Sequence, residues 1–200
     1  MRQRIYVAIT LAFAFAIASA AHAKVVYTQV NTVIPVGGYY NIVLIPNGVT
    51  DFTLHSKLVQ GYCQWGDEYD WTLTVTPADG NAVMIDTGHV GSDYASALLS
   101  GVVVDSSQSF YSGESVMAGL YWGACGTGTL GEWLNLPARY LGLQFQGPDG
   151  ETHYGWAEVS AVAYVDQNGH LQTNTVLFGF AYETVPSQEI LSGQISDGDL

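Results

Sequence analysis

The stretch YDWTLTVT, at residues 69–76, is the clearest strand in the sequence. Its apolar residues Trp71, Leu73 and Val75 alternate with polar ones, a period of two that is typical of a strand with one buried face. Comparable β-rich runs flank turn signatures that contain Asn-Gly or Asp-Gly, pairs that tolerate the positive φ of tight hairpins. These signatures occupy residues 46–48, 77–80, 147–150 and 166–169.

The C-terminal third continues this pattern as a three-strand meander over residues 140–146, 152–165 and 171–183. Both faces of residues 176–182 are apolar, which predicts a strand buried between two layers. Helix signals are confined to residues 92–100, between a candidate Ser cap and a Gly stop. We therefore expect an all-β fold, an antiparallel β-sandwich of jelly-roll-like form with at most one short helix.

The N-terminus carries the pattern of a Sec-type signal peptide. Two arginines precede an apolar run at residues 11–18, and the Ala-His-Ala at residues 21–23 predicts cleavage after Ala23. The run is shorter than the ~20 residues of a membrane helix, so we expect no membrane span in the mature chain. We predict a cleaved signal peptide at 1–23, one β-sandwich domain at 24–186 and a polar flexible tail at 187–200. The expected location is secreted or periplasmic.

The charge of the chain limits its partners. After residue 23 only Lys24, Lys57 and Arg139 are basic, against 18 carboxylates, which gives a net charge of −15. Such a surface repels nucleic acid, because phosphate binding needs Lys and Arg to displace counterions. It suits neutral sugars or divalent cations, and it equally serves solubility outside the cell. An extracellular polysaccharide or a surface protein is the expected kind of partner.

The two cysteines, Cys63 and Cys125, are expected to form a disulfide, since an exported chain with a single pair usually oxidises it. Closing a loop over their separation of 62 residues would stabilise the fold by about 4 kcal/mol on the chain-entropy model. Two buried thiols are the alternative. The spacing matches no standard metal motif.

Four aromatic residues in Gly-rich surroundings are candidates for a ligand face: Trp65, Tyr121, Trp122 and Trp133. Exposed Trp and Tyr rings stack on sugars, although aromatic residues equally fill cores because they bury large areas. The glycines at residues 126–131 spell GxGxxG. They lack the strand-turn-helix context of a dinucleotide site, so we interpret them as a loop.

Carboxylates at short spacing indicate two further alternatives. Asp67, Glu68 and Asp70, and separately Asp166 with Asn168, offer oxygen ligands that suit Ca²⁺, the one cofactor the sequence suggests. Neither set completes an EF-hand loop, and Asp166 and Asn168 are equally explained as turn formers. Paired carboxylates in the first set would also serve glycoside hydrolysis, which needs two at a fixed separation.

Three motifs in the C-terminal half carry a resemblance. They are Arg139-Tyr140-Leu141-Gly142-Leu143-Gln144-Phe145, then His153-Tyr154-Gly155-Trp156-Ala157, then Ala181-Tyr182-Glu183-Thr184-x-Pro186. In this order they resemble a family of uncharacterised exported bacterial β-rich proteins, many of which carry a PEP-CTERM sorting tail. The resemblance implies an extracellular or surface protein and brings no catalytic residues. No such tail follows Pro186 in this sequence.

Two residues of these motifs carry specific hypotheses. His153 lies near carboxylates, but strand alternation places it on the opposite face from Glu158, which favours a packing role over a catalytic or metal-binding one. Arg139 is the only arginine after residue 23. We expect it to form a bidentate pair with Glu158 or Glu183 that fixes the start of the meander.

The sequence lacks the GxSxG and HExxH patterns of common hydrolases. We therefore expect a non-enzymatic exported module with a structural or adhesive role. A carbohydrate-binding β-sandwich, with or without Ca²⁺, is one alternative. A secreted hydrolase that uses paired carboxylates is the other.

Overall fold

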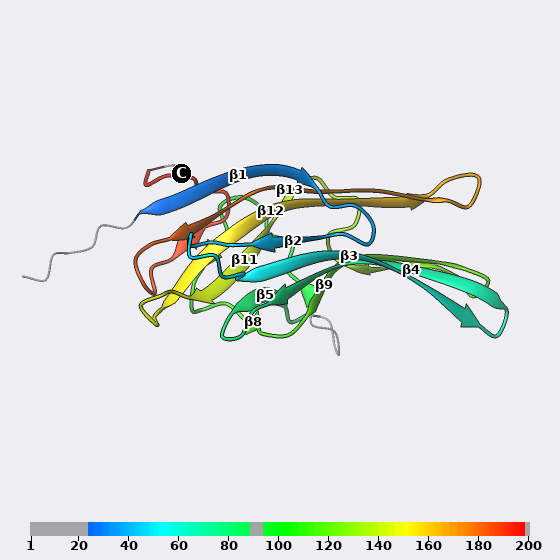
Figure 1. Cartoon of the computed structure of the whole chain (residues 1–200), viewed down its shortest axis with the longest axis horizontal. Coiled ribbons are helices and arrows are strands. Elements are labelled where there is room, and N and C mark those ends of the chain that lie inside the picture. Colours follow the sequence, from blue (N-terminus) through cyan, green and yellow to red (C-terminus); the bar gives the residue numbers. More distant parts are fainter. Residues whose placement is uncertain (1–23, 89–93, 199–200) are drawn as a thin grey trace, which may run out of the picture.

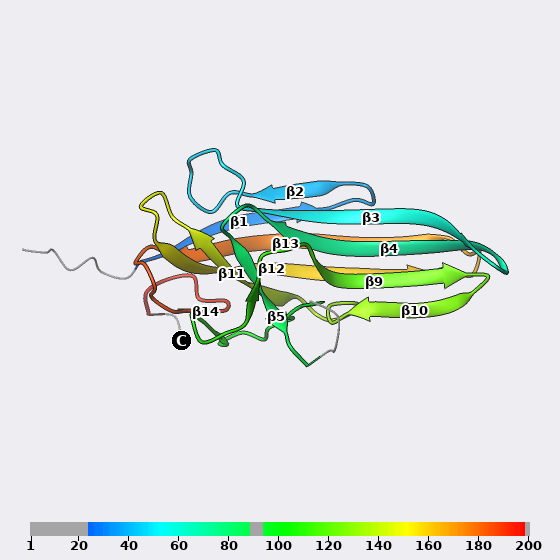
Figure 2. The same cartoon turned by 90° about the horizontal axis from the view of Figure 1, so that it is seen from below.

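The computed structural model describes residues 24–88 and 94–198, and within these ranges the chain is entirely β, with no helix. Twelve strands form one large sheet that curls into two facing layers (Figures 1 and 2), and two short strands form a small second sheet. This architecture confirms the predicted all-β class.

The first layer is built on the C-terminal meander. Its strands β11 (Arg139–Gln146), β12 (Thr152–Val165) and β13 (Leu171–Glu183) pair antiparallel in that order, as the sequence predicted. The N-terminal strand β1 (Val25–Val33) pairs with the other side of β13, so the two ends of the domain lie side by side (Figure 1).

The second layer consists of β2 (Tyr39–Ile42), β3 (Phe52–Cys63), β4 (Gly66–Pro77), β9 (Ser115–Gly123) and β10 (Gly126–Gly131), all antiparallel. Short strands join the layers. Strand β5 (Ala82–Asp86) pairs with β11 of the first layer, with β8 (Phe110–Tyr111) and with β6 (Tyr94–Ala95). Strand β6 pairs in parallel with β9 of the second layer.

The main core lies between the two layers and follows the predicted alternation. Trp71, Leu73 and Val75 of β4 are fully buried, and they face residues such as Leu141 and Leu143 from the first layer. The indole of Trp71 donates a hydrogen bond to Ser56 Oγ at 3.0 Å, which satisfies its one polar atom inside the core.

A second, smaller core covers the outer face of the first layer. Tyr154, Trp156 and Ala181 pack there against the small sheet formed by β7 (Val103–Val104) and β14 (Ile190–Leu191). Strands β12 and β13 therefore have apolar contacts on both faces. This arrangement confirms the two-layer burial that the apolar residues 176–182 predicted.

Within residues 187–198, the part from Ile190 to Gln194 packs on the domain, with Ile190 in this second core, so the expected flexible tail is wrong for that part, while residues 187–189 and 195–198 are exposed. Ile190 and Ser192 are fully buried, and the Trp156 indole donates to the Gln194 carbonyl at 3.1 Å. The polar side chains that suggested a solvated tail instead make hydrogen bonds: Ser192 Oγ donates to the Leu99 carbonyl at 2.6 Å.

The short helix expected at residues 92–100 does not form where the structure describes that stretch, from residue 94 onward. Tyr94 and Ala95 form β6, and Leu98 forms a bridge with Tyr140 through two backbone hydrogen bonds of 3.0 Å. The neighbouring strand β11 thus satisfies the backbone groups that a helix would have paired internally. The described residues contain no helix long and apolar enough to cross a membrane.

Candidate functional site

A cleft opens between the two layers at the end of the domain opposite the start of β1 and the end of β13 (Figure 1). There the β3–β4 and β9–β10 hairpins of one layer and the β12–β13 turn of the other extend past the core (Figure 1). The cleft has a volume of about 450 Å³. It is lined by Val36, Leu58, Tyr69 and Trp122 on one side and by Gly169, His170 and Leu171 on the other.

Two aromatic rings form the floor of this cleft. Tyr69 and Trp122 are direct partners in the β4–β9 register, two residues along each strand from the buried pair Trp71 and Leu120. Their rings stack with centroids 5.4 Å apart and planes inclined by 18°. The core ends at the preceding row, so both rings face inward and remain partly exposed.

The opposite wall is the β12–β13 turn, which is stabilised by hydrogen bonds among its own residues. Asp166 Oδ1 accepts hydrogen bonds of 2.9 Å from the backbone amides of Asn168 and His170, and Oδ2 accepts one of 3.2 Å from the Gln172 amide. These bonds, led by the one from His170, lower the pKa of Asp166 below its usual range. Asp166 therefore acts as a turn former, and Asn168 contributes its backbone amide to the same turn.

The four aromatic residues predicted as one ligand face do not lie together. Only Trp122 lines the cleft, while Tyr121 points to the opposite face of β9 and Trp65 is 72% exposed at the tip of the β3–β4 hairpin. Trp133 is a core residue, 1% exposed, and its indole donates to the Ala95 carbonyl at 2.8 Å. Its Gly-rich surroundings suggested a surface, but just after β10 ends its backbone amide donates to the Met117 carbonyl at 3.2 Å, and its side chain lies in the core.

Tyr69 is the cleft residue that sequence analysis missed. It lies two positions before Trp71 on the same face of the best-predicted strand, so the alternation already contained the signal. What the sequence did not contain was the position of the core boundary along that face. That boundary depends on contacts with the facing first layer, whose strands are distant in the sequence.

A smaller pocket of about 310 Å³ lies on the outer face of the second layer. Glu68 and Asp70 line it together with Tyr121, because residues two apart on β4 share a face. Burial raises the pKa of Asp70 above its usual range, and its Oδ1 is buried without a hydrogen-bond partner. Asp67 lies on the other face of the strand, so the predicted acidic triplet is divided.

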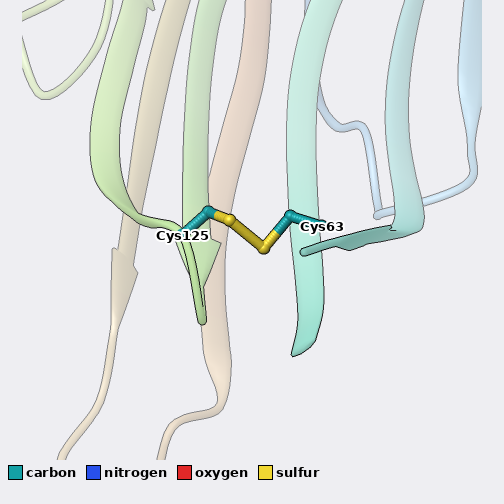
Figure 3. Close-up of a disulfide and its surroundings, with 2 residues drawn as sticks. All are labelled: Cys63 and Cys125. Atoms are coloured by element: carbon teal, nitrogen blue, oxygen red, sulfur yellow. A yellow bond between two sulfur atoms is a disulfide. The ribbon is translucent and has the colours of Figure 1, made fainter. Parts of the chain in front are cut away.

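The disulfide between Cys63 and Cys125 is present, as predicted, with Cα atoms 6.3 Å apart (Figure 3). It joins the end of β3 to the β9–β10 turn, beyond the last row of the core. The described residues contain one cluster with metal-ligand spacing, which is Glu68 with these two sulfurs. The sulfurs are bonded to each other, so they are not thiolate ligands.

The glycine-rich segment at residues 126–131 is strand β10, and the loop interpretation of it is wrong. It pairs with β9 along its whole length. Gly128 faces Tyr121 in this register, and any Cβ at residue 128 would collide with the tyrosine ring. The glycine therefore provides the room in which the Tyr121 ring lies flat across β10.

His153 has the packing role that alternation favoured. It is 3% exposed, with Nδ1 3.1 Å from the Glu183 carbonyl oxygen and Nε2 3.2 Å from a carboxylate oxygen of Asp149. The ring also stacks on Phe145 at 5.5 Å. These contacts join the β11–β12 turn to the end of β13.

The expected Arg139 ion pair is not formed. Its guanidinium donates to the adjacent Ala138 carbonyl at 3.2 Å. Burial alone raises the pKa of Glu158, with no lowering by a nearby cation. The Glu183 carboxylate instead accepts hydrogen bonds from backbone amides at the start of β1 and after β13. Backbone amides, rather than Arg139, therefore satisfy the buried Glu183 carboxylate.

Comparison with protein-family models, curated proteins and solved structures found no match to this chain. The fold and the site define the class of this chain. It is an all-β, disulfide-bonded protein with an aromatic cleft between two sheet layers.

Proposed function

We propose that this chain is an exported, non-enzymatic β-sandwich module that adheres to carbohydrate through the interlayer cleft. The stacked Tyr69–Trp122 pair carries the proposal, because it places two partly exposed rings at the base of a concave site. Sugar rings present apolar C–H faces that pack on aromatic rings, and ligand sites typically combine such surfaces with a few polar groups. His170 supplies a polar group on the opposite wall.

The charge of the protein narrows the ligand class. A chain with a net charge of −15 after residue 23 disfavours anionic polymers, so a neutral glycan is the ligand we propose. The N-terminal signal pattern and the disulfide support an extracellular or periplasmic location, where such polymers occur.

A glycan array tests the proposal with the chain that begins at Lys24, with and without Ca²⁺. We expect binding to neutral glycans. Trp122→Ala should weaken it tenfold or more, since loss of one ring contact worth about 1.4 kcal/mol has that effect. Trp65→Ala is the matched control, because this tryptophan is exposed outside the cleft. Absence of binding in both conditions, or equal loss in both variants, would refute the cleft as a glycan site.

The outer-face pocket favours a second candidate, glycoside hydrolysis. Glu68 and Asp70 lie two apart on one strand and line the same pocket, so both carboxylates face one space, as the two carboxylates of a glycosidase must. The raised pKa of Asp70 suits a general acid, and Glu68 would then act as the base. Release of new reducing ends from a bound glycan, lost in both Glu68→Gln and Asp70→Asn, would establish this activity. An intact glycan after prolonged incubation would exclude it.

A further inference from the structure

The backbone at Lys24 is held by a buried carboxylate. The Lys24 amide donates to Glu183 Oε1 at 2.9 Å, and the Val185 amide donates to the same oxygen at 2.8 Å. The Lys24 carbonyl in turn accepts from the Thr184 amide at 3.1 Å. Lys24 is thus fixed by β13 and the residues after it at the point where the predicted signal peptide ends.

The surroundings of this contact are acidic. Glu183 is 2% exposed, and it lines a cavity of about 220 Å³ with Glu189 and Asp197. Asp197 Oδ1 accepts a hydrogen bond of 2.8 Å from the Val25 amide. A buried carboxylate is costly unless it is hydrogen-bonded and paired with a cation. The Glu183 bonds given above all come from neutral donors.

Among the described residues, neither Lys57 nor Arg139 pairs with the Glu183 carboxylate. Lys57 pairs with Glu114 at 2.8 Å on the second layer, and the Arg139 guanidinium donates to the Ala138 carbonyl. A positive charge at the Lys24 nitrogen itself would therefore complete the site.

We propose that Glu183 is the binding site for the α-ammonium group that processing creates at Lys24, an inference that rests on the proposed export. Hydrolysis of the Ala23–Lys24 bond by a signal peptidase consumes one water. Ala23 leaves with a new carboxylate, and Lys24 retains the nitrogen as a primary amine that takes up a proton. The atom that donates to Glu183 as a neutral amide then becomes a charged donor at the same place.

This change strengthens the contact without moving the strand. An ammonium adds a direct attraction between opposite charges that the amide donor lacks, so its hydrogen bond to the carboxylate is the stronger of the two. The pair joins β1 to β13, the strands that bring the two ends of the domain together. Cleavage thus stabilises the fold that remains, and the uncleaved chain has the weaker version of the contact.

Thermal melts of two purified chains test the pairing, one that begins at Lys24 and one that retains the native Ala-His-Ala before it. We expect the shorter chain to melt about 3 °C higher, the shift that roughly one extra ion-pair interaction gives in a domain of this size. Glu183→Gln should abolish the difference, whereas Glu189→Gln, at an exposed residue of the same cavity, should preserve it. Equal melting temperatures for the two chains would overturn the proposal.

Acylation of the α-amine provides a measurement that needs no variant, in case Glu183→Gln fails to fold. In the chain that begins at Lys24, an ion-paired amine should react at least tenfold more slowly in the folded protein than in urea. Equal rates would contradict the pairing.

The intact mass of the full chain expressed in a bacterial host separates this inference from the export proposal. A secreted or periplasmic product that begins at Lys24 supports both. An exported product that begins elsewhere overturns the processing site and leaves export intact. A full-length product retained in the cytoplasm overturns export, while the melts of the two purified chains still decide whether Glu183 binds the ammonium.

Discussion

Replacement of both Cys63 and Cys125 by serine should lower the melting temperature by about 8–16 °C. The disulfide closes a loop over a sequence separation of 62 residues. On the chain-entropy model, loss of such a closure stabilises the unfolded chain by about 4 kcal/mol. A domain of 150–250 residues loses about 2–4 °C per kcal/mol, which gives the expected range.

The native fold should survive this change, because other contacts hold the same region. Cys63 pairs with Gly66 in the β3–β4 register, and the Ala124 amide donates to the Asp67 carbonyl at 2.9 Å. Serine is close to cysteine in size, and neither position belongs to the core. The effect is therefore expected to arise from the unfolded state rather than from lost packing.

Circular dichroism melts of the oxidised wild type, the reduced wild type and the double serine variant provide the assay. The reduced protein and the variant should melt together, well below the oxidised protein, with the same spectrum at 20 °C. A variant that melts within 2 °C of the oxidised wild type would refute the loop-entropy argument. A changed folded spectrum would show instead that the disulfide shapes the native state.

Three further predictions address the core, the C-terminal segment and pH. Trp133→Ala should cost about 3–5 kcal/mol in urea unfolding, whereas Trp65→Ala, at an exposed ring, should stay within about 0.5 kcal/mol of the wild type. Ile190→Ala should cost about 2–5 kcal/mol because the side chain is fully buried, and an unchanged stability would restore the flexible-tail prediction. Asp51→Asn keeps an acceptor for the Leu44 amide and removes a carboxyl whose pKa burial raises. Charging that carboxyl costs stability only in the wild type, so the variant should gain relative stability as the pH rises from about 4 towards neutrality, and a constant difference between pH 3 and pH 7 in urea titrations would contradict this.

Much of the fold could be predicted because its strands carry local signals. The alternation around Trp71 marks a strand with one buried face, and residues 176–182 are apolar on both faces because two cores enclose β13. Turn chemistry placed the hairpins between the meander strands. These features depend on residues next to one another in the chain, which is the range over which sequence patterns are informative.

The elements that sequence analysis misjudged depend on distant partners. Residues 94–100 have the composition of a short helix, but Tyr94 and Ala95 pair with β5 and Leu98 pairs with β11, so tertiary contacts override a weak local preference. Residues 187–198 are polar, yet they cover an apolar surface on β12 and β13 that exists only once the meander has formed. Neither outcome can be obtained from the local residues alone.

Only part of the candidate site could be predicted, because its residues also come from distant parts of the chain. Trp122 belongs to the set of aromatic residues predicted to bind ligand, but its stacking partner Tyr69 comes from a strand about fifty residues earlier. Trp133 has equally Gly-rich surroundings and is nevertheless buried. Composition identified aromatic residues of the types that stack on sugars, whereas the register between β4 and β9 determines which of them line a cleft.

The position of the cleft explains why the disulfide and the hydrogen-bonded β12–β13 turn lie at the same end of the molecule. The hairpins that form it extend beyond the core, so apolar packing contributes least to their order. The disulfide between Cys63 and Cys125 restrains one wall, and the hydrogen bonds to Asp166 shape the turn that forms the other. A site whose walls are restrained before binding loses less conformational entropy when a ligand enters. The reduced protein should therefore bind the proposed glycan more weakly than the oxidised protein at a temperature where both remain folded, and equal affinity would show that the core alone orders the cleft.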